Sequence, residues 1–184
     1  MTTTHIEDVQ PLKTREAIAD MKWSLRKWCG ERDYIMFIIG INSGLRISDL
    51  LKLKTEDLKG KKSIKIQEKK TKKPRTIHLD SIYDEIQSYI ADNPSEWMFP
   101  SRQGTKPISP TQAYRQLVKA GEMVDIDSMG THTMRKTFGF WHYKQHGNIA
   151  MLQGILNHSS SQITLRYIGI TEEEERESII ALNL

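Results

Sequence analysis

Two histidines, an arginine and a tyrosine in the last third of the chain carry groups suited to phosphate chemistry. His132 and Arg135 stand in Thr-His-Thr-Met-Arg, His158 stands in Leu-Asn-His-Ser-Ser, and Tyr167 follows another arginine. A second candidate, Arg46, lies far upstream in Gly-Leu-Arg-Ile-Ser-Asp-Leu. Guanidinium groups bind phosphate oxygens as planar forks, and a phenol attacks phosphorus when nearby positive charge favours its phenolate. These residue types therefore fit a site that holds and cleaves a phosphodiester.

Each of these residues also has an ordinary structural explanation. His132 and Arg135 are three residues apart, so they share one helix face and could form a surface pair without a role. Arg46 lies among apolar residues and needs a charged partner, for which Asp49 and Asp57 are the candidates. A tyrosine is more often packed against a core than used as a nucleophile. Residue types alone leave both explanations open.

The elements expected around these residues are mostly helical. Residues 34–41 are apolar on every side, which predicts a buried helix just before Arg46. Thr131 is expected to cap a helix that carries the first histidine and arginine of the candidate site. A short helical turn from Ser161 leads to Tyr167. The pattern predicts a mainly α protein in which helices present the candidate groups.

A small antiparallel β-hairpin is expected between the helices. Residues 63–67 and 75–79 alternate apolar and polar side chains around a polar turn, so one face of the hairpin is apolar. The fold class is therefore α+β, mainly α, with a flexible lead over residues 1–12 and one domain over residues 13–184. The hairpin turn concentrates positive charge that suits an anionic polymer, and its candidate contacts are Lys69, Lys70, Lys72, Lys73 and Arg75.

Composition narrows the class of protein. The chain has 184 residues, 38% hydrophobic and 27% charged, with a net charge of +4, as expected for a globular protein in the cytoplasm. No apolar run reaches the roughly 20 residues of a membrane helix. Cys29 is the only cysteine, which excludes an intrachain disulfide and a thiolate zinc cluster. His132, His142 and His146 lack an acidic or cysteine ligand at suitable spacing, so no metal is expected.

The motifs together resemble the catalytic domain of the tyrosine recombinases, or phage-type integrases. The resemblance rests on Gly44-Leu45-Arg46, the Lys-Thr turn before Arg75, Phe99-Pro100-Ser101, His132-x-x-Arg135, Leu156-Asn157-His158 and Tyr167, in family order and spacing. It runs from about Thr14 to the C-terminus. Asn157 stands where the family commonly has glycine, a departure that concerns the local turn.

The resemblance implies a role for each residue and no cofactor. Arg46 and Arg135 would bind the scissile phosphate, and His158 would donate a hydrogen bond to it. His132 would help remove the proton of Tyr167, which would attack and form a 3′-phosphotyrosyl link. Lys70, chosen among the turn lysines because it precedes threonine, would protonate the 5′ leaving oxygen. Lys69, Lys72, Lys73 and Arg75 are predicted to bind DNA.

The resemblance also implies partners and alternatives. Double-stranded DNA would be the substrate on the nucleoid, and a tetramer would assemble on it through the C-terminal helix, residues 171–184. Only 45 residues precede Arg46, so the N-terminal clamp domain of the family is expected to be missing. This leaves open a recombinase-like DNA-binding regulator or accessory protein. A type IB topoisomerase shares the chemistry, but the short length and motif order disfavour it.

Overall fold

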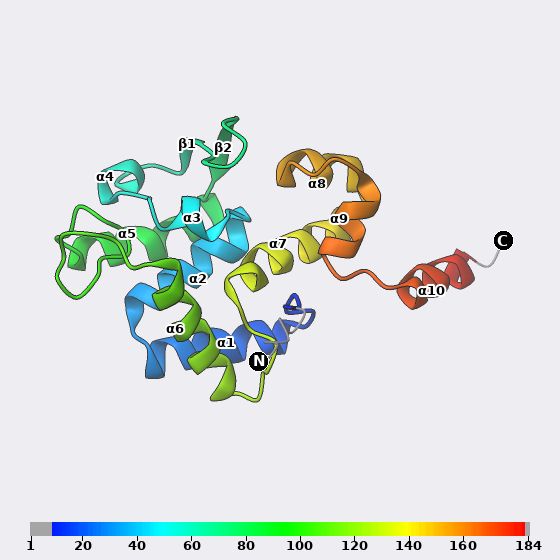
Figure 1. Cartoon of the computed structure of the whole chain (residues 1–184), viewed down its shortest axis with the longest axis horizontal. Coiled ribbons are helices and arrows are strands. Elements are labelled where there is room, and N and C mark those ends of the chain that lie inside the picture. The colour runs from blue at the N-terminus through cyan, green and yellow to red at the C-terminus, as the bar shows by residue number, and fades with distance from the viewer. Residues whose placement is uncertain (1–8, 183–184) are drawn as a thin grey trace, which may run out of the picture.

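The computed structural model describes residues 9–182 and shows a helical body with a two-stranded sheet at one edge (Figure 1). The elements in chain order are α1 (Arg15–Trp28), α2 (Glu31–Ser43), α3 (Ile47–Leu50), α4 (Thr55–Leu58), β1 (Ser63–Gln67), β2 (Pro74–His78), the 3₁₀ turn η1 (Asp80–Ile82), α5 (Tyr83–Asp92), α6 (Pro110–Glu122), α7 (Thr131–His146), α8 (Ile149–Leu156), α9 (Ser161–Tyr167) and α10 (Glu172–Leu182). The predicted fold class, mainly α with a small hairpin, is confirmed.

Helix α2 is the buried centre of the body. Residues 33–40 are all buried, and α1, α5, α6 and α7 pack around the helix. This confirms the helix predicted from the unbroken apolar run. The helix ends at Gly44, which has a φ of 61°, and a Cβ added there would lie 2.3 Å from the Phe138 ring. Only glycine satisfies both conditions, and the resulting tight turn delivers Arg46 next to α7.

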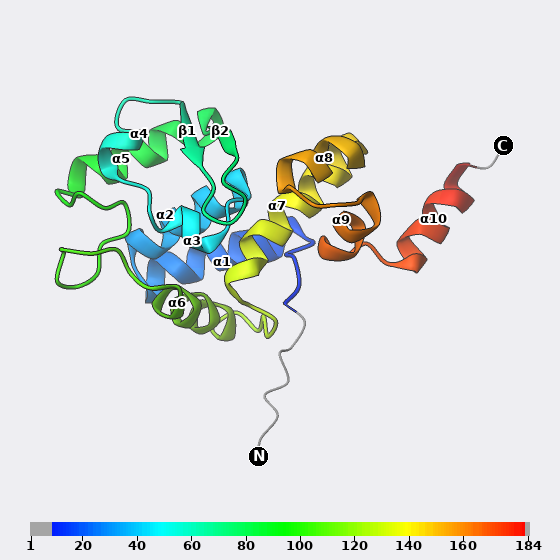
Figure 2. The same cartoon turned by 45° about the horizontal axis from the view of Figure 1, so that its top comes forward.

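Helix α7 connects the main core to a smaller one. Met134 belongs to the main core, whereas Phe140 packs with Leu152, Leu156 and Ile168 in a second cluster formed with α8 and α9. Figure 2 shows α7 running from the body towards these two helices. Thr131 was expected to cap α7, and this was wrong. Gly130 is the cap residue, and the Thr133 hydroxyl accepts its N–H at 3.0 Å.

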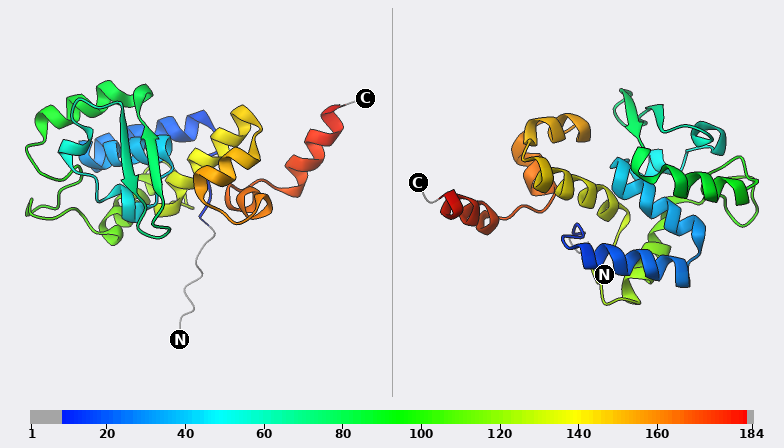
Figure 3. Two further views of the ribbon diagram at one scale, coloured as in Figure 1. Left: turned by 90° about the horizontal axis from the view of Figure 1, so that it is seen from above. Right: turned by 180° about the vertical axis from the view of Figure 1, so that it is seen from behind.

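The hairpin has the predicted alternation. Strand β1 pairs antiparallel with β2, from Ser63 opposite His78 to Gln67 opposite Pro74. Ile64 and Ile77 are buried on the inner face. The hairpin therefore lies with one face on the body, and its strands are seen side by side in the left view of Figure 3.

The N-terminal end of the described chain packs beside α7, whereas the C-terminal helix leaves the body. Leu12 is buried and its N–H donates to Thr137, so residues 11–12 pack on the body; residues 1–8 of the predicted lead lie outside the described residues. Helix α10 extends away from the body (Figures 1 and 2), and Lys13 pairs with Glu174 at 3.1 Å near its start. Across residues 9–182, no helix has both the length and the apolarity to cross a membrane.

Candidate active site

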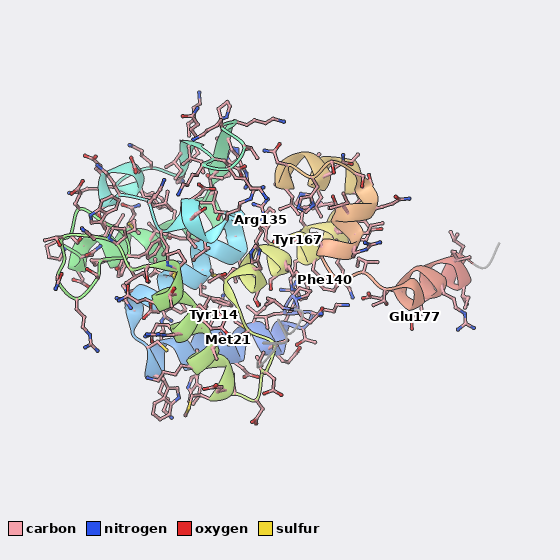
Figure 4. All side chains as sticks on the ribbon, viewed as in Figure 1. Met21, Tyr114, Arg135, Phe140, Tyr167 and Glu177 are labelled. Carbon is pink, nitrogen blue, oxygen red and sulfur yellow. The ribbon has the colours of Figure 1, made fainter. Side chains whose placement is uncertain are left out.

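Tyr167 ends helix α9 and faces the N-terminal part of α7. Its hydroxyl lies 3.3 Å from Nδ1 of His132, and its ring meets the ring of His158 edge-on with centroids 4.8 Å apart. Burial raises the pKa of the phenol, although the positive charges of Arg135 and Arg46 oppose this shift. Figure 4 shows Arg135 and Tyr167 close together where α7 meets α9. The phenol is therefore neutral at pH 7 and needs a base to become a nucleophile.

Both histidines are held in the neutral form. Partial burial, followed by the charge of Arg135, lowers the pKa of His132 and of His158. Nδ1 of His158 lies 3.1 Å from the hydroxyl of Thr164, which fixes the ring orientation. A neutral imidazole within reach of a phenol can accept its proton, so His132 is placed to act as a base.

Arg135 is buried, with 2% of its surface exposed. Its guanidinium donates to the carbonyl of Gly44 at the end of α2 and, at 2.6 Å, to the carbonyl of Leu156 at the end of α8. Burial, with the repulsion of nearby Arg46, lowers its pKa to about 10. Among the described residues the guanidinium forms no ion pair, although the charge of Glu68 partly opposes the lowering of its pKa.

The acidic partner of Arg46 is Glu68, and not Asp49 or Asp57 as the sequence suggested. Its Nη1 donates to Glu68 at 2.7 Å, whereas Asp49 accepts the backbone N–H of Lys69. The side chain of Glu68 is fully buried, and its other oxygen lies 3.5 Å from Nη1 of Arg75. Arg46 and Arg75 therefore both contact the carboxylate of Glu68, at the start of the hairpin turn.

The lysines of the hairpin turn differ in their surroundings. Lys70 is exposed, and its charge is the smallest contribution to the lowered pKa of His132, after burial and the charges of Arg135, Lys136 and Arg46. Lys73 donates to the side chain of Asn157 at 3.2 Å. Lys69 and Lys72 are also exposed. The structure therefore brings the predicted site residues into one region between the hairpin, α7 and α9.

Three further residues join the site without having been predicted. Glu68 continues the inward alternation of Ile64 and Ile66 along β1, a signal that would have placed its carboxylate on the buried face. Asn157 donates to Glu68 at 3.4 Å. Nζ of Lys136 lies over the Tyr167 ring, 5.5 Å from its centre, in a cation–π contact. No sequence motif marked Lys136.

Within residues 9–182, no group of three His, Cys, Asp or Glu side chains is arranged to hold a metal ion. The rings of His142 and His146 approach to 4.9 Å on the outer part of α7, without a third ligand among the described residues.

Comparisons with known proteins identify the family and the fold. A protein-family model described as "Phage integrase family" matches residues 15–174 of the chain. The chain is 47% identical over 171 residues to a probable integrase/recombinase, YoeC, of Bacillus subtilis, covering 91% of this chain and 93% of that protein. It is 32% identical over 156 residues to a tyrosine recombinase of Pseudothermotoga lettingae, covering 81% of this chain but 53% of that protein.

Solved structures share the fold at low sequence identity. The crystal structure of XerA recombinase matches with a TM-score of 0.76 at 20% identity, over 95% of this chain and 66% of that one. The XerH recombinase bound to palindromic difH substrate, a post-cleavage complex, matches with a TM-score of 0.75 at 18% identity, over 93% and 52%. The chain thus spans between half and two thirds of these structures.

Proposed function

Because the chain belongs to the phage integrase family, we propose that it is a tyrosine-type DNA strand transferase that cuts and rejoins double-stranded DNA. The observation that carries the proposal is the convergence on the Tyr167 hydroxyl of a neutral histidine and the charges of two arginines. This arrangement suits attack by a phenol on a phosphodiester. The substrate phosphate supplies the anion that the buried guanidinium of Arg135 lacks.

The proposed reaction proceeds by one in-line displacement at phosphorus. Arg46 and Arg135 bind the nonbridging oxygens, and His158 donates to one of them. The phenolic proton of Tyr167 passes to His132 as the bond from the phenolic oxygen to phosphorus forms. The bond from phosphorus to the 5′ oxygen breaks, and the ammonium of Lys70 protonates that oxygen. The products are a 3′-phosphotyrosyl ester and a free 5′-hydroxyl.

The second half of the reaction reverses the first with another strand. The phosphotyrosyl ester keeps the energy of the cleaved bond, so a second 5′-hydroxyl can attack it and reseal the backbone. Lys70 in its neutral form accepts the proton of that hydroxyl, and His132 returns a proton to Tyr167. Each group therefore ends the cycle in its starting state.

Trapping on nicked duplexes tests this function. The duplexes together cover the DNA on both sides of the gene. A nick beside the cleavage position lets the short fragment that carries the free 5′-hydroxyl diffuse away, so the strand cannot be resealed and the covalent adduct accumulates. The wild-type protein should form an adduct with one of them, and Tyr167→Phe should form none. A wild-type protein that binds a duplex but forms no adduct contradicts the proposal and favours the DNA-binding regulator or accessory protein.

We further propose that α10 mediates assembly into a tetramer on DNA at the nucleoid. Its apolar residues are unusually exposed, at 69% for Ile179, 63% for Ile180 and 63% for Leu182. Figure 4 shows the helix, marked by Glu177, standing clear of the body. A surface of this kind can be covered by a neighbouring copy, which would link the protomers that exchange strands.

A further inference from the structure

Glu68 is a buried charge that the proposed mechanism does not use. One of its carboxylate oxygens accepts hydrogen bonds from Arg46 at 2.7 Å, Thr71 at 2.9 Å and Asn157 at 3.4 Å. Attraction to Arg46 and the bond from Thr71 lower the pKa of Glu68 despite its burial, so the group is an anion. A buried carboxylate costs several kcal/mol unless its partners compensate it, so this network constrains the geometry of everything attached to it.

Asn157 connects that network to the opposite side of the site. It is the cap residue of α8 with a φ of 54°, a left-handed conformation that asparagine tolerates better than other residues with a side chain. Its amide nitrogen donates to Glu68, and its amide oxygen accepts from Lys73 at 3.2 Å. A glycine would keep the turn and lose both contacts. The asparagine thus adds a link between the hairpin and the helices that carry His158 and Tyr167.

We propose that Glu68 and Asn157 form a latch that positions the lysine-bearing hairpin turn over the arginine pair, so that Lys70 meets the leaving oxygen. The latch holds the turn at two points, in its middle at Thr71 and near its end at Lys73, and Lys70 is adjacent to Thr71. It rests on the function proposed above. Both are positioning residues. Glu68 acts through Arg46 and Thr71, and Asn157 acts through Lys73.

The latch acts on two steps that can be separated. Glu68 orients Arg46 directly, so it affects both charge stabilisation and the placement of Lys70. Asn157 contacts only Glu68 and Lys73 through its side chain, so its loss loosens the turn and leaves Arg135 in place. A misplaced general acid slows cleavage only when the leaving group needs a proton. Weaker phosphate binding slows cleavage with either leaving group.

The test compares two leaving groups in single-turnover cleavage. The probe is the tiled duplex that wild type cleaves, made with oxygen or with sulfur at the bridging 5′ position; a thiolate leaves without protonation. Asn157→Gly should slow the oxygen substrate by about 10²-fold, within the range of general acid catalysis, and the sulfur substrate by less than about threefold. Glu68→Gln should slow both, and the oxygen substrate more.

Equal slowing of the two substrates by Asn157→Gly, or no slowing of either, would overturn the latch. Asp33→Asn is the matched control, since Asp33 is a buried carboxylate paired with Arg32 at 2.9 Å, about 15 Å along α2 from the site. It should cleave both substrates as wild type does. If wild type cleaves no duplex, the proposed function fails, and the next measurement alone decides the latch.

Amide hydrogen exchange tests the latch without DNA. The N–H of Lys72 donates to the carbonyl of Glu68 at 2.9 Å, and that of Lys69 to Asp49 at 2.9 Å. Asn157→Gly should speed exchange at both amides by about tenfold, as expected when a local opening becomes easier. The amide of Ile66, within β1, serves as the internal reference and should not change. Unchanged protection at Lys69 and Lys72 refutes the latch.

Discussion

Replacing Arg135 with lysine should separate stability from catalysis. The guanidinium donates to two carbonyls on different helices, at Gly44 and Leu156. A lysine keeps the charge, but its single ammonium reaches only one of them. Losing one charge-assisted hydrogen bond costs about 1.5–3 kcal/mol of unfolding free energy. The same change removes the fork that grips the phosphate, and loss of one such donor typically slows the chemical step by about 10²–10³-fold.

The assay measures adduct formation on the nicked duplex, at a temperature well below the midpoint of thermal unfolding of the variant. The matched control is Arg32→Lys, because Arg32 also donates to a backbone carbonyl, that of Pro100 at 3.0 Å, at the far end of α2. Arg32→Lys should lose stability and cleave normally. Adduct formation within threefold of wild type in folded Arg135→Lys would refute the role assigned to the fork.

Three further outcomes follow from the charges and the exposed helix. Because the pKa of His132 is lowered, cleavage should be constant from about pH 8 to 7 and fall only below the ordinary histidine pKa of about 6.5, when the base becomes protonated; a fall already complete at pH 7 would contradict this. DNA binding should weaken steeply with salt, and Lys72→Gln should reduce the slope by about 0.9; a flat response would contradict phosphate contacts at the turn. Deleting residues 171–184 should reduce assembly on DNA without unfolding the body, and sedimentation that matches wild type would reject that role for α10.

Stability should also depend on pH through the same histidines. The pKa values of His132 and His158 are lowered in the folded protein, so the unfolded chain binds more protons near its ordinary pKa of about 6.5. The free energy of unfolding therefore falls as pH drops through this value, and stops falling for these groups below their folded pKa. Denaturant midpoints at pH 7.5 and 5.5 measure this change in stability. The change should be smaller when His132 and His158 are both replaced by alanine.

The elements were largely predictable because local sequence decides them. The apolar run of residues 34–41 is stable only when it is buried on all sides. The alternation of residues 63–67 predicts a strand with one buried face. The cap of α7 was less predictable, since Thr131 and Thr133 are both capping residue types. Which hydroxyl accepts the first free N–H depends on the backbone entering from Gly130, and this is set by tertiary packing.

The site was predictable in its residues but not in its wiring. Motif order identified Arg46 and Tyr167, yet the partner of Arg46 is Glu68, which lies 22 positions away just after β1, and not the neighbouring Asp49. Pairings at such separation depend on how the hairpin lies against α2. Asn157 was recognised as a departure at a turn, but its contact with Lys73 spans 84 positions. Sequence spacing carries no information about that contact.

The charges of the DNA-free site indicate why these long contacts matter. Arg135 keeps a lowered pKa, close to 10, and Tyr167 a raised one, so the site holds a cation short of anions beside a phenol that resists ionisation. A bound phosphate relieves the first condition, and the positive charge gathered around it assists the second at the moment of attack. Glu68 forms a hydrogen bond with Arg46, whereas it acts on Arg135 only through its charge, which partly offsets the lowering of the pKa of Arg135. Arg46 is thus paired with a carboxylate of the protein, while Arg135 is held by two neutral carbonyls and its charge is left for the substrate to neutralise.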